Sequence, residues 1–401
     1  MSFELLFFLT FAGGWLASRL FELIKLPGVM GMTIFGVALG TIIRYLGLSW
    51  PDGFWQIEPF IKSLALVIIL LRAGLGISRK RLNKAGLPAL LMAFIPCIFE
   101  GVVLLFALRW LFEFSFPVAG LTAFMIAAVS PAVVVPAMLD LQSRGMGQKN
   151  GVITVVLAGA SVDDVLAISL FSVFLGLSVD PATSANVFQP LLMLPLVLGG
   201  GIILGLLAGF GLAHWFRRGH KQIRATEKAI LLLASGIFLL QVGDFLHVAA
   251  LLGVMTLGFI LVERAEHAAH ELAEKLGKIW VAAQIALFVI IGLSLEVGVL
   301  SEVGLKALVA LGLGLSARSL GVLLATWPSS LTFQERIFCV IAYLPKATVQ
   351  AALGGVALAA GLPEGQAILG IAVLAIVITA PAGLLGIRLG AKRLLTVDGL
   401  Q

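Results

Sequence analysis

Two adjacent aspartates, Asp163 and Asp164, lie inside the long apolar stretch of residues 152–174. A carboxylate near the centre of a bilayer costs roughly 2.5 to 3.5 kcal/mol on insertion scales, so an acid at this depth usually serves a function. Burial disfavours the charged form of a carboxyl group, whereas a neighbouring cation favours it. The pair therefore predicts a functional site within the membrane, because two adjacent acids at this depth are hard to explain as packing.

Four further ionisable side chains fall within apolar runs, namely Glu100, Arg72, Arg318 and Lys346. With the aspartates they make three acids and three bases, which favours mutual pairing inside the protein over exposure to lipid. Arg72 is near a predicted helix end, where its side chain can reach the membrane surface, so we interpret it as structural. Lys346 and Arg318 are both candidates to compensate the charge of the first aspartate, and the sequence leaves the choice open.

Proline interrupts two of the apolar runs, after Ser130 at Pro131 and before Lys346 at Pro345. Proline removes a backbone donor and clashes with the preceding turn, which frees carbonyl groups that protein, water or an ion must satisfy. We expect freed carbonyls, the Ser130 hydroxyl and Asp164 to supply oxygen ligands for a cation. Because adjacent helical residues point about 100° apart, one aspartate should face the cation and the other a base.

The composition is that of a membrane protein. Hydrophobic residues make up 60% of the 401 and charged residues 12%, against roughly 45 to 50% and 25% in soluble domains. Mean hydropathy is +1.10. Apolar runs of about 20 residues are long enough to cross a bilayer as helices. The predicted spans are 4–22, 29–47, 60–78, 86–110, 116–139, 150–177, 188–215, 227–244, 247–263, 276–295, 303–326, 334–360 and 365–387, which makes thirteen, or twelve if the runs on either side of residues 244–247 merge.

Charge in the loops supports the thirteen-span count and sets the orientation. When loops alternate between the two sides, most of the 27 Lys and Arg fall on one side, and only Arg44, Lys62, Arg109 and Lys306 lie on the other. By the positive-inside rule, the N-terminus is external and the C-terminus cytoplasmic. The net charge of +6 is then explained by loops that face anionic lipid, without a nucleic-acid partner.

An internal repeat organises the buried charges. If spans one to six and eight to thirteen are two copies joined by span seven, Glu100 and Arg318 occupy the same place in their copies, as do Pro131 and Pro345. An odd linker inverts the second copy. The predicted fold is therefore all-α, with two inverted six-helix repeats and crossed discontinuous helices, as in secondary transporters. The matching positions predict a structural ion pair between Glu100 and Arg318.

Glycine patterns suggest how this single transporter domain, residues 1–401, is divided. Small residues at every fourth position allow close helix packing, as at Gly36 and Gly40, and at Gly201, Gly205 and Gly209. We expect residues 29–59 and 188–263 to form a scaffold that also makes a homodimer in the lipid membrane. Residues 60–177 and 303–387 would form the core transport part.

Several segments resemble one transporter family. They are Ser-Pro-Ala-Val-Val-Val-Pro at 130–136, the aspartate pair within 160–168, Leu-Pro-Lys-Ala-Thr-Val-Gln-Ala-Ala at 344–352 and Leu-Arg-Ala-Gly-Leu-Gly at 71–76. Over residues 60–385 the chain is similar to sodium/proton antiporters of the monovalent cation:proton antiporter superfamily. The closest likeness is to the Nha-type sodium/hydrogen exchangers of animals and their bacterial relatives.

The resemblance implies an antiporter that serves pH homeostasis in a cell membrane, which the short chain suggests is bacterial. It implies that Asp163 and Asp164 bind cation and protons alternately, that Lys346 or Arg318 pairs with the first acid, and that Glu100 and Arg318 form a further ion pair. Where some members of the family have threonine and aspartate in the first broken helix, this chain has Ser130 and Pro131. The choice among Na⁺, Li⁺ and K⁺, and the exchange ratio, therefore stay open.

Other functions fit the residues less well. A sodium-coupled symporter of related fold is the near alternative, but it would use more neutral polar ligands and no buried lysine beside an acid pair. A K⁺/H⁺ antiporter is a further alternative. An intramembrane aspartyl protease needs its two aspartates on different helices. The sequence shows neither a channel filter nor the spacing of a transition-metal site, and Cys97 and Cys339 are isolated within apolar runs. We thus expect no enzyme activity and no cofactor, only transported Na⁺ or Li⁺ and H⁺.

Overall fold

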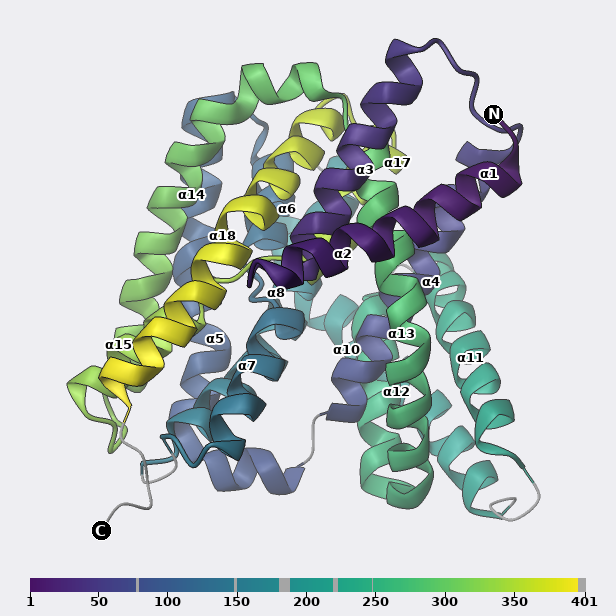
Figure 1. Cartoon of the computed structure of the whole chain (residues 1–401). Coiled ribbons are helices and arrows are strands. Elements are labelled where there is room, and N and C mark those ends of the chain that lie inside the picture. Colours follow the sequence, from purple (N-terminus) through teal and green to yellow (C-terminus); the bar gives the residue numbers. More distant parts are fainter. Residues whose placement is uncertain (77–78, 148–149, 180–187, 219–222, 247, 396–401) are drawn as a thin grey trace.

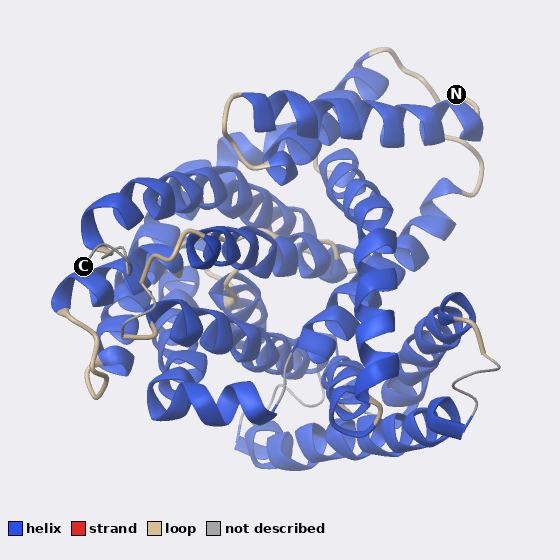
Figure 2. Ribbon diagram, turned by 60° about the horizontal axis from the view of Figure 1, so that its bottom comes forward, coloured by secondary structure: helices blue, strands red, loops and turns tan. Residues whose placement is uncertain are grey.

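The structure of the chain, a computed structural model, describes residues 1–401 except 77–78, 148–149, 180–187, 219–222, 247 and 396–401. Within the described residues every regular element is a helix (Figure 2). Ten helices there are long and apolar enough to cross a membrane. The chain is an all-helical integral membrane protein.

The helices differ in length because several apolar runs are interrupted. In chain order they are α1 (Phe3–Phe8), the π-helical segment η1 (Leu9–Gly13), α2 (Gly14–Leu23), α3 (Gly28–Tyr45), α4 (Phe54–Gly76), α5 (Arg79–Phe112), α6 (Phe116–Ala127), α7 (Pro131–Ser143), α8 (Val152–Val179), α10 (Phe188–Arg218), α11 (Ala225–Leu246), α12 (Ala250–Arg264), α13 (Glu266–Ser294), α14 (Val297–Thr326), α15 (Phe333–Ala342), α16 (Thr348–Gly354), α17 (Val356–Ala359) and α18 (Gly365–Leu394). Two predicted spans, 116–139 and 334–360, are each divided between shorter helices.

Helix starts have local causes in the sequence. Ser115 precedes α6, and its hydroxyl accepts a hydrogen bond from the Val118 amide, which would otherwise lack a partner in the first turn. Thr332 and Glu335 form a reciprocal capping box at the start of α15. These caps fix where the segments that lead into the breaks begin.

Several helices extend beyond their predicted apolar spans. α13 begins at Glu266 rather than at residue 276, and α4 begins at Phe54 rather than at residue 60. Hydropathy detects only the part of a helix that suits hydrocarbon, whereas charged residues continue the helix outside it, as the Glu274–Lys278 pair does in α13. Lys62, near the start of its predicted span, therefore lies more than two turns inside α4.

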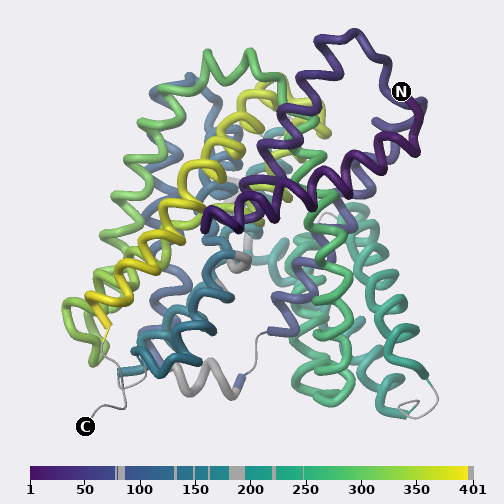
Figure 3. Tube along the Cα trace, in the orientation of Figure 1, coloured from purple at the N-terminus to yellow at the C-terminus, as the bar shows by residue number. Residues whose placement is uncertain are grey.

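The helices pack into two bodies (Figures 1 and 3). In the first body, defined here as α5–α8 and α14–α18, α5 packs on α6, α8 and α14, and α18 packs on α14, α15 and α16. In the second body, defined as α2–α4 and α10–α13, α12 packs on α4 and α10, and α13 packs on α3 and α4. The bodies meet where α16 contacts α4 and α13, where α18 contacts α3 and α13, and where α8 contacts α10 and α12. The expected core part began at residue 60, but α4 packs chiefly within the second body.

The glycine patterns contribute to packing within the chain. A Cβ at Gly40 would lie 2.9 Å from the Leu293 carbonyl oxygen of α13, and one at Gly209 would lie 2.8 Å from the Ile260 side chain of α12. These glycines therefore allow α3 and α10 to approach α13 and α12 of the same chain. They are not by themselves evidence for a surface between two copies.

Candidate ion-binding site

The two helix breaks meet in the interior of the first body. α6 ends at Ala127 and α7 begins at Pro131, while α15 ends at Ala342 and α16 begins at Thr348. The Ser130 amide donates a 2.8 Å hydrogen bond to the Pro345 carbonyl, which joins the two breaks directly. Pro131 occupies the first position of its helix, where a missing amide hydrogen removes no helical bond. Segments far apart in the sequence are thus fixed at one point.

Close packing holds the second break against α18. A Cβ at Gly383 would lie 2.7 Å from Cδ of Pro345, so the absence of a side chain leaves room for the proline ring. The Lys346 amide donates a 2.8 Å hydrogen bond to the Thr379 hydroxyl of α18. Backbone groups that the break leaves without helical partners are satisfied here by protein groups.

Arg318 of α14 is the centre of a buried charge cluster. Its Nη2 lies 3.0 Å from both carboxylate oxygens of Asp163, and its Nη1 lies 2.6 Å from Oε2 of Glu100. Nη1 also donates to the Ala127 carbonyl at the end of α6. The ring of Tyr343 lies 5.1 Å from the guanidinium carbon. The planar fork of arginine can hold two carboxylates at once, which the single ammonium of lysine cannot do with the same geometry.

Lys346 contacts the same cluster from the second break. Its Nζ lies 2.6 Å from Oε2 of Glu100 and 3.4 Å from the Ala127 carbonyl oxygen. Asp163, for which the sequence did not decide between the two bases, is hydrogen bonded to Arg318 and to the Val129 amide. In this conformation Lys346 pairs with Glu100, so of the two candidate bases it is Arg318 that pairs with Asp163. Arg318 takes that place because its fork approaches α8 from α14.

The charges of the two bases and two acids in the cluster cancel, and Asp164 is an additional acid outside these pairs. Arg318 and Lys346 offset Asp163 and Glu100, and all four are buried. Asp164 is also buried, and its Oδ1 has no hydrogen-bond partner among the described residues. An ionised Asp164 would add one uncompensated negative charge to this interior. Its carboxyl group therefore requires a proton or an exogenous cation.

Most of the freed carbonyls are already in use, which corrects the expectation that they would serve a cation. Gln350 Nε2 lies 3.0 Å from the carbonyl oxygens of Met125 and Ala128, and 3.2 Å from that of Ile126. The Ala127 carbonyl accepts from the cluster bases. Side chains of the first body thus neutralise the negative end of the α6 dipole.

The hydroxyl groups near the breaks remain candidates to assist Asp164. Ser130 is fully buried, and its Oγ lies 3.5 Å from Oγ1 of Thr348. The preceding residue, Val129, donates its amide to Asp163. Serine, threonine and carboxylate oxygens at the crossing of two breaks are suitable ligands for a small hard cation.

Sequence reasoning missed Thr348, Gln350, Thr379 and Tyr343. Thr348 and Gln350 lie in the quoted segment 344–352, so their polar character in an apolar run was a usable signal. Thr379 and Tyr343 act through neighbours that only the fold brings together. Arg72 lies 5.6 Å from the Trp280 ring, a contact with α13 that fits its structural interpretation.

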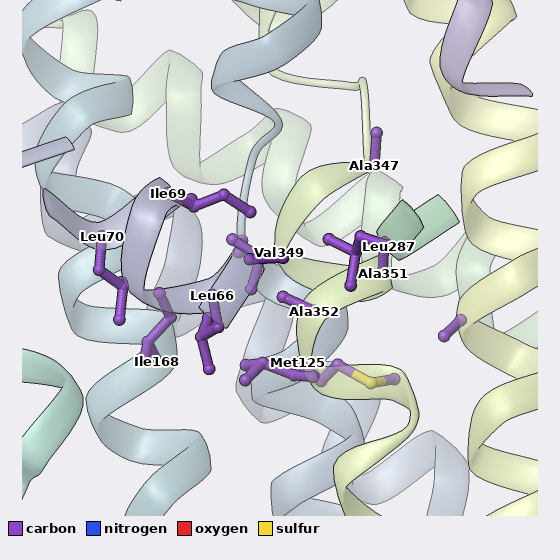
Figure 4. Close-up of a cluster of buried hydrophobic side chains, with 14 of the residues drawn as sticks. Leu66, Ile69, Leu70, Met125, Ile168, Leu287, Ala347, Val349, Ala351 and Ala352 are labelled. Carbon is purple, nitrogen blue, oxygen red and sulfur yellow. The ribbon is translucent and has the colours of Figure 1, made fainter. Parts of the chain in front are cut away.

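A large hollow separates the two bodies on one side of the cluster. It has a volume of about 1010 Å³ and is lined by α2, α3 and α13 on one wall and by α7 and α18 on the other. Val133, one turn after Ser130, forms part of its wall. On the opposite side, Leu66 and Ile69 of α4 pack with Val349 and Ala352 of α16 in an apolar cluster (Figure 4). The interface thus has a large hollow on one side of the site and a packed apolar cluster on the other.

Known proteins resemble the chain over nearly its whole length. Residues 6–389 match the family described as "Sodium/hydrogen exchanger, transmembrane". The chain is 32% identical over 412 residues to mouse sodium/hydrogen exchanger 9B2, which covers 98% of this chain and 73% of the mouse protein. It is 29% identical over 407 residues to human sodium/hydrogen exchanger 9B1, covering 96% and 77%. The fold is similar to that of the sodium proton antiporter MjNhaP1 from Methanocaldococcus jannaschii, with a TM-score of 0.80, 21% identity and coverage of 96% and 97%.

Proposed function

The chain belongs to the sodium/hydrogen exchanger family, and we propose that it exchanges Na⁺ or Li⁺ for H⁺ across the membrane by alternating access. The observation that carries the proposal is Asp164, the buried carboxyl left over by a cluster whose other charges balance. A proton or a monovalent cation can each supply the missing positive charge, but one excludes the other. Loading with Na⁺ expels the proton, and protonation expels Na⁺.

We propose that Ser130, and with it Thr348, assists Asp164 in binding the cation. Asp163 has two bonds to Arg318 and one to the Val129 amide, so it is positioned mainly by protein groups. Oδ1 of Asp164, by contrast, has no hydrogen-bond partner within the part of the chain that the structure describes. This division agrees with the expectation that the adjacent aspartates have separate partners. It assigns Asp164 to the cation and Asp163 to the base.

The proposed transport cycle uses the interface between the two bodies. We propose thirteen crossings in two inverted repeats, with the basic loops and the C-terminus cytoplasmic. On that orientation the 1010 Å³ hollow is on the cytoplasmic side, since α2 ends and α18 ends there. The apolar cluster of α4 and α16 would then close the external side. Movement of the first body, with its broken helices, along the second would expose Asp164 alternately. The proposed ion-binding residues lie in the first body, and we propose that a homodimer forms through the second.

One experiment tests the assignment. Purified protein in liposomes receives an inward Na⁺ gradient while internal pH is followed with a fluorescent dye. An antiporter alkalinises the lumen in the absence of any other solute. Li⁺ and K⁺ gradients define the cation, and no pH change with any of them would refute proton exchange. Na⁺ uptake that required an organic solute would instead favour the symporter.

Replacing Lys346 by glutamine should shift the pH dependence of exchange. The substitution removes one positive charge from the balanced cluster, which makes proton binding at the remaining carboxylates easier. Activity should therefore begin at higher pH, by about one unit, corresponding to about 1.4 kcal/mol of lost charge interaction. Binding of Na⁺ at alkaline pH should persist, because Asp164 and Ser130 remain. Current on a solid-supported membrane, recorded against pH, measures the shift.

The same recordings address stoichiometry. If Lys346 releases a proton as the cation enters, two protons move per Na⁺ and the wild-type protein gives a net current. The exposed Lys278→Gln, which removes a lysine that is 69% exposed, is the matched control. An unchanged pH profile together with an unchanged melting temperature in Lys346→Gln would show that Lys346 is not coupled to the aspartates.

A further inference from the structure

A second buried ion pair lies at the end of the interface opposite the large hollow. Glu58 and Lys62, one turn apart on α4, form an ion pair with side chains that are only 7% and 8% exposed. Ser294, the last residue of α13, donates a 3.1 Å hydrogen bond to Oε1 of Glu58. Nζ of Lys62 lies 3.5 Å from the same hydroxyl. All three groups belong to the second body.

The Lys62 side chain also reaches the first body. A Cβ at Gly355, the junction between α16 and α17, would lie 2.6 Å from Nζ of Lys62, 3.3 Å from Cε and 3.6 Å from Cδ. The end of the lysine therefore fits against this junction because the junction has no side chain. Its ammonium lies in the boundary between the two bodies.

The pair forms the inner end of a cavity. The cavity has a volume of about 470 Å³ and is lined from both bodies, by Glu58, Lys62 and Ser294 of the second and by Gly355 and Gln366 of the first. Gln366 Nε2 donates to the Ser294 carbonyl at 3.3 Å, a further contact across the boundary. One turn beyond Lys62, Leu66 begins the apolar cluster of α4 and α16 (Figure 4). Along the interface, Lys62 is thus the last charged group before that cluster.

We propose that Lys62 is the external gate of the transporter and that Glu58 is the first buried carboxylate to receive an external monovalent cation, inward of the exposed Glu296 that lines the same cavity. In the closed form the Lys62 ammonium occupies the cation position beside Glu58 and repels ions that approach. When the bodies separate, the contact with Gly355 is lost and the flexible lysine stem lets the ammonium withdraw into the cavity. Glu58 remains on α4, next to the Ser294 hydroxyl, and faces the opening. The inference rests on the proposed exchange activity and orientation.

Sided transport measurements test the gate. Right-side-out vesicles present the external face and everted vesicles the cytoplasmic face, and the KM for Na⁺ is measured on each. Lys62→Met, which keeps chain length but removes the charge, should lower the external KM by about 3- to 10-fold, because it removes the ammonium that competes with Na⁺ at Glu58. Glu58→Gln should raise the external KM by a similar factor. The cytoplasmic KM should stay the same in both, which a general structural defect would not produce.

Gly355→Ala provides a variant that keeps both charges. Its Cβ displaces only the flexible end of Lys62, so the protein should fold and the external KM should fall about 2- to 3-fold, since the competing ammonium is moved rather than removed. Controls are Gly304→Ala, where a Cβ meets nothing within 4 Å, and Lys306→Met, an exposed lysine predicted on the same side. Equal changes on both faces, or no external change in Lys62→Met and Gly355→Ala, would overturn the gate alone. Loss of all Na⁺-driven proton flux in the wild type would instead overturn the proposed function.

Discussion

Asp164→Asn is expected to abolish Na⁺-driven proton flux, down to the level of protein-free liposomes, while the protein remains folded in the membrane. The amide neither exchanges a proton in the physiological range nor carries the charge that offsets the desolvation of a cation. Folding should survive because Asp164 takes no part in the balanced cluster around Arg318. Its melting temperature should equal or exceed that of the wild type.

Asp163→Asn is a useful comparison because it should lower stability as well as flux, whereas Asp164→Asn should lower flux alone. Among the described residues, Asp163→Asn leaves Arg318 and Lys346 with Glu100 as their one buried ion-pair partner, so stability as well as flux should decrease. The exposed Glu302→Gln of α14 removes the same charge at a site without function and should transport like the wild type. Proton flux of wild-type size in Asp164→Asn would refute the assignment of the cation site.

The residues of the site could be named from the sequence because ionisable side chains are so costly in hydrocarbon. Asp163, Asp164, Glu100, Arg318 and Lys346 each interrupt an apolar run, and the structure brings them into one cluster or beside it. The breaks at the two prolines were visible for a similar reason, since proline removes a backbone donor wherever it occurs. Such signals are local, so they can be recognised in the sequence without knowledge of the fold.

The pairing within the cluster could not be predicted because it depends on helix rotation and crossing depth. Whether Arg318 or Lys346 reaches Asp163 is decided by the angle at which α14 presents its guanidinium to α8. The use of the α6 carbonyls by Gln350 depends on the same tertiary placement. Hydropathy located the start of α4 six residues too late, at 60 instead of Phe54, so Glu58 fell outside the predicted span.

Neutralising Glu100 or Arg318 singly is expected to lower stability strongly, by roughly 3 to 5 kcal/mol, the range measured when one partner of a buried ion pair is removed. Arg318→Gln leaves Asp163 without its base, although Glu100 keeps Lys346. Glu100→Gln leaves Lys346 without its acid, although Arg318 keeps Asp163. The two single variants thus strand opposite charges. Thermal unfolding in detergent, followed by the fluorescence of the seven tryptophans, reports both losses.

The Glu100→Gln, Arg318→Gln double variant should recover part of the loss. It retains Lys346 and Asp163, one base and one acid, so the cluster returns to neutral charge. Lys346 Nζ already lies 3.4 Å from the Ala127 carbonyl, to which Arg318 also donates, so the ammonium has only a short way to move toward Asp163. Arg318→Lys, which keeps the charge but not the fork, should lie between the wild type and Arg318→Gln. Because coupled residues deviate from additivity by about 0.5 to 3 kcal/mol, strictly additive losses in the double variant would show that the two groups do not share one charge cluster.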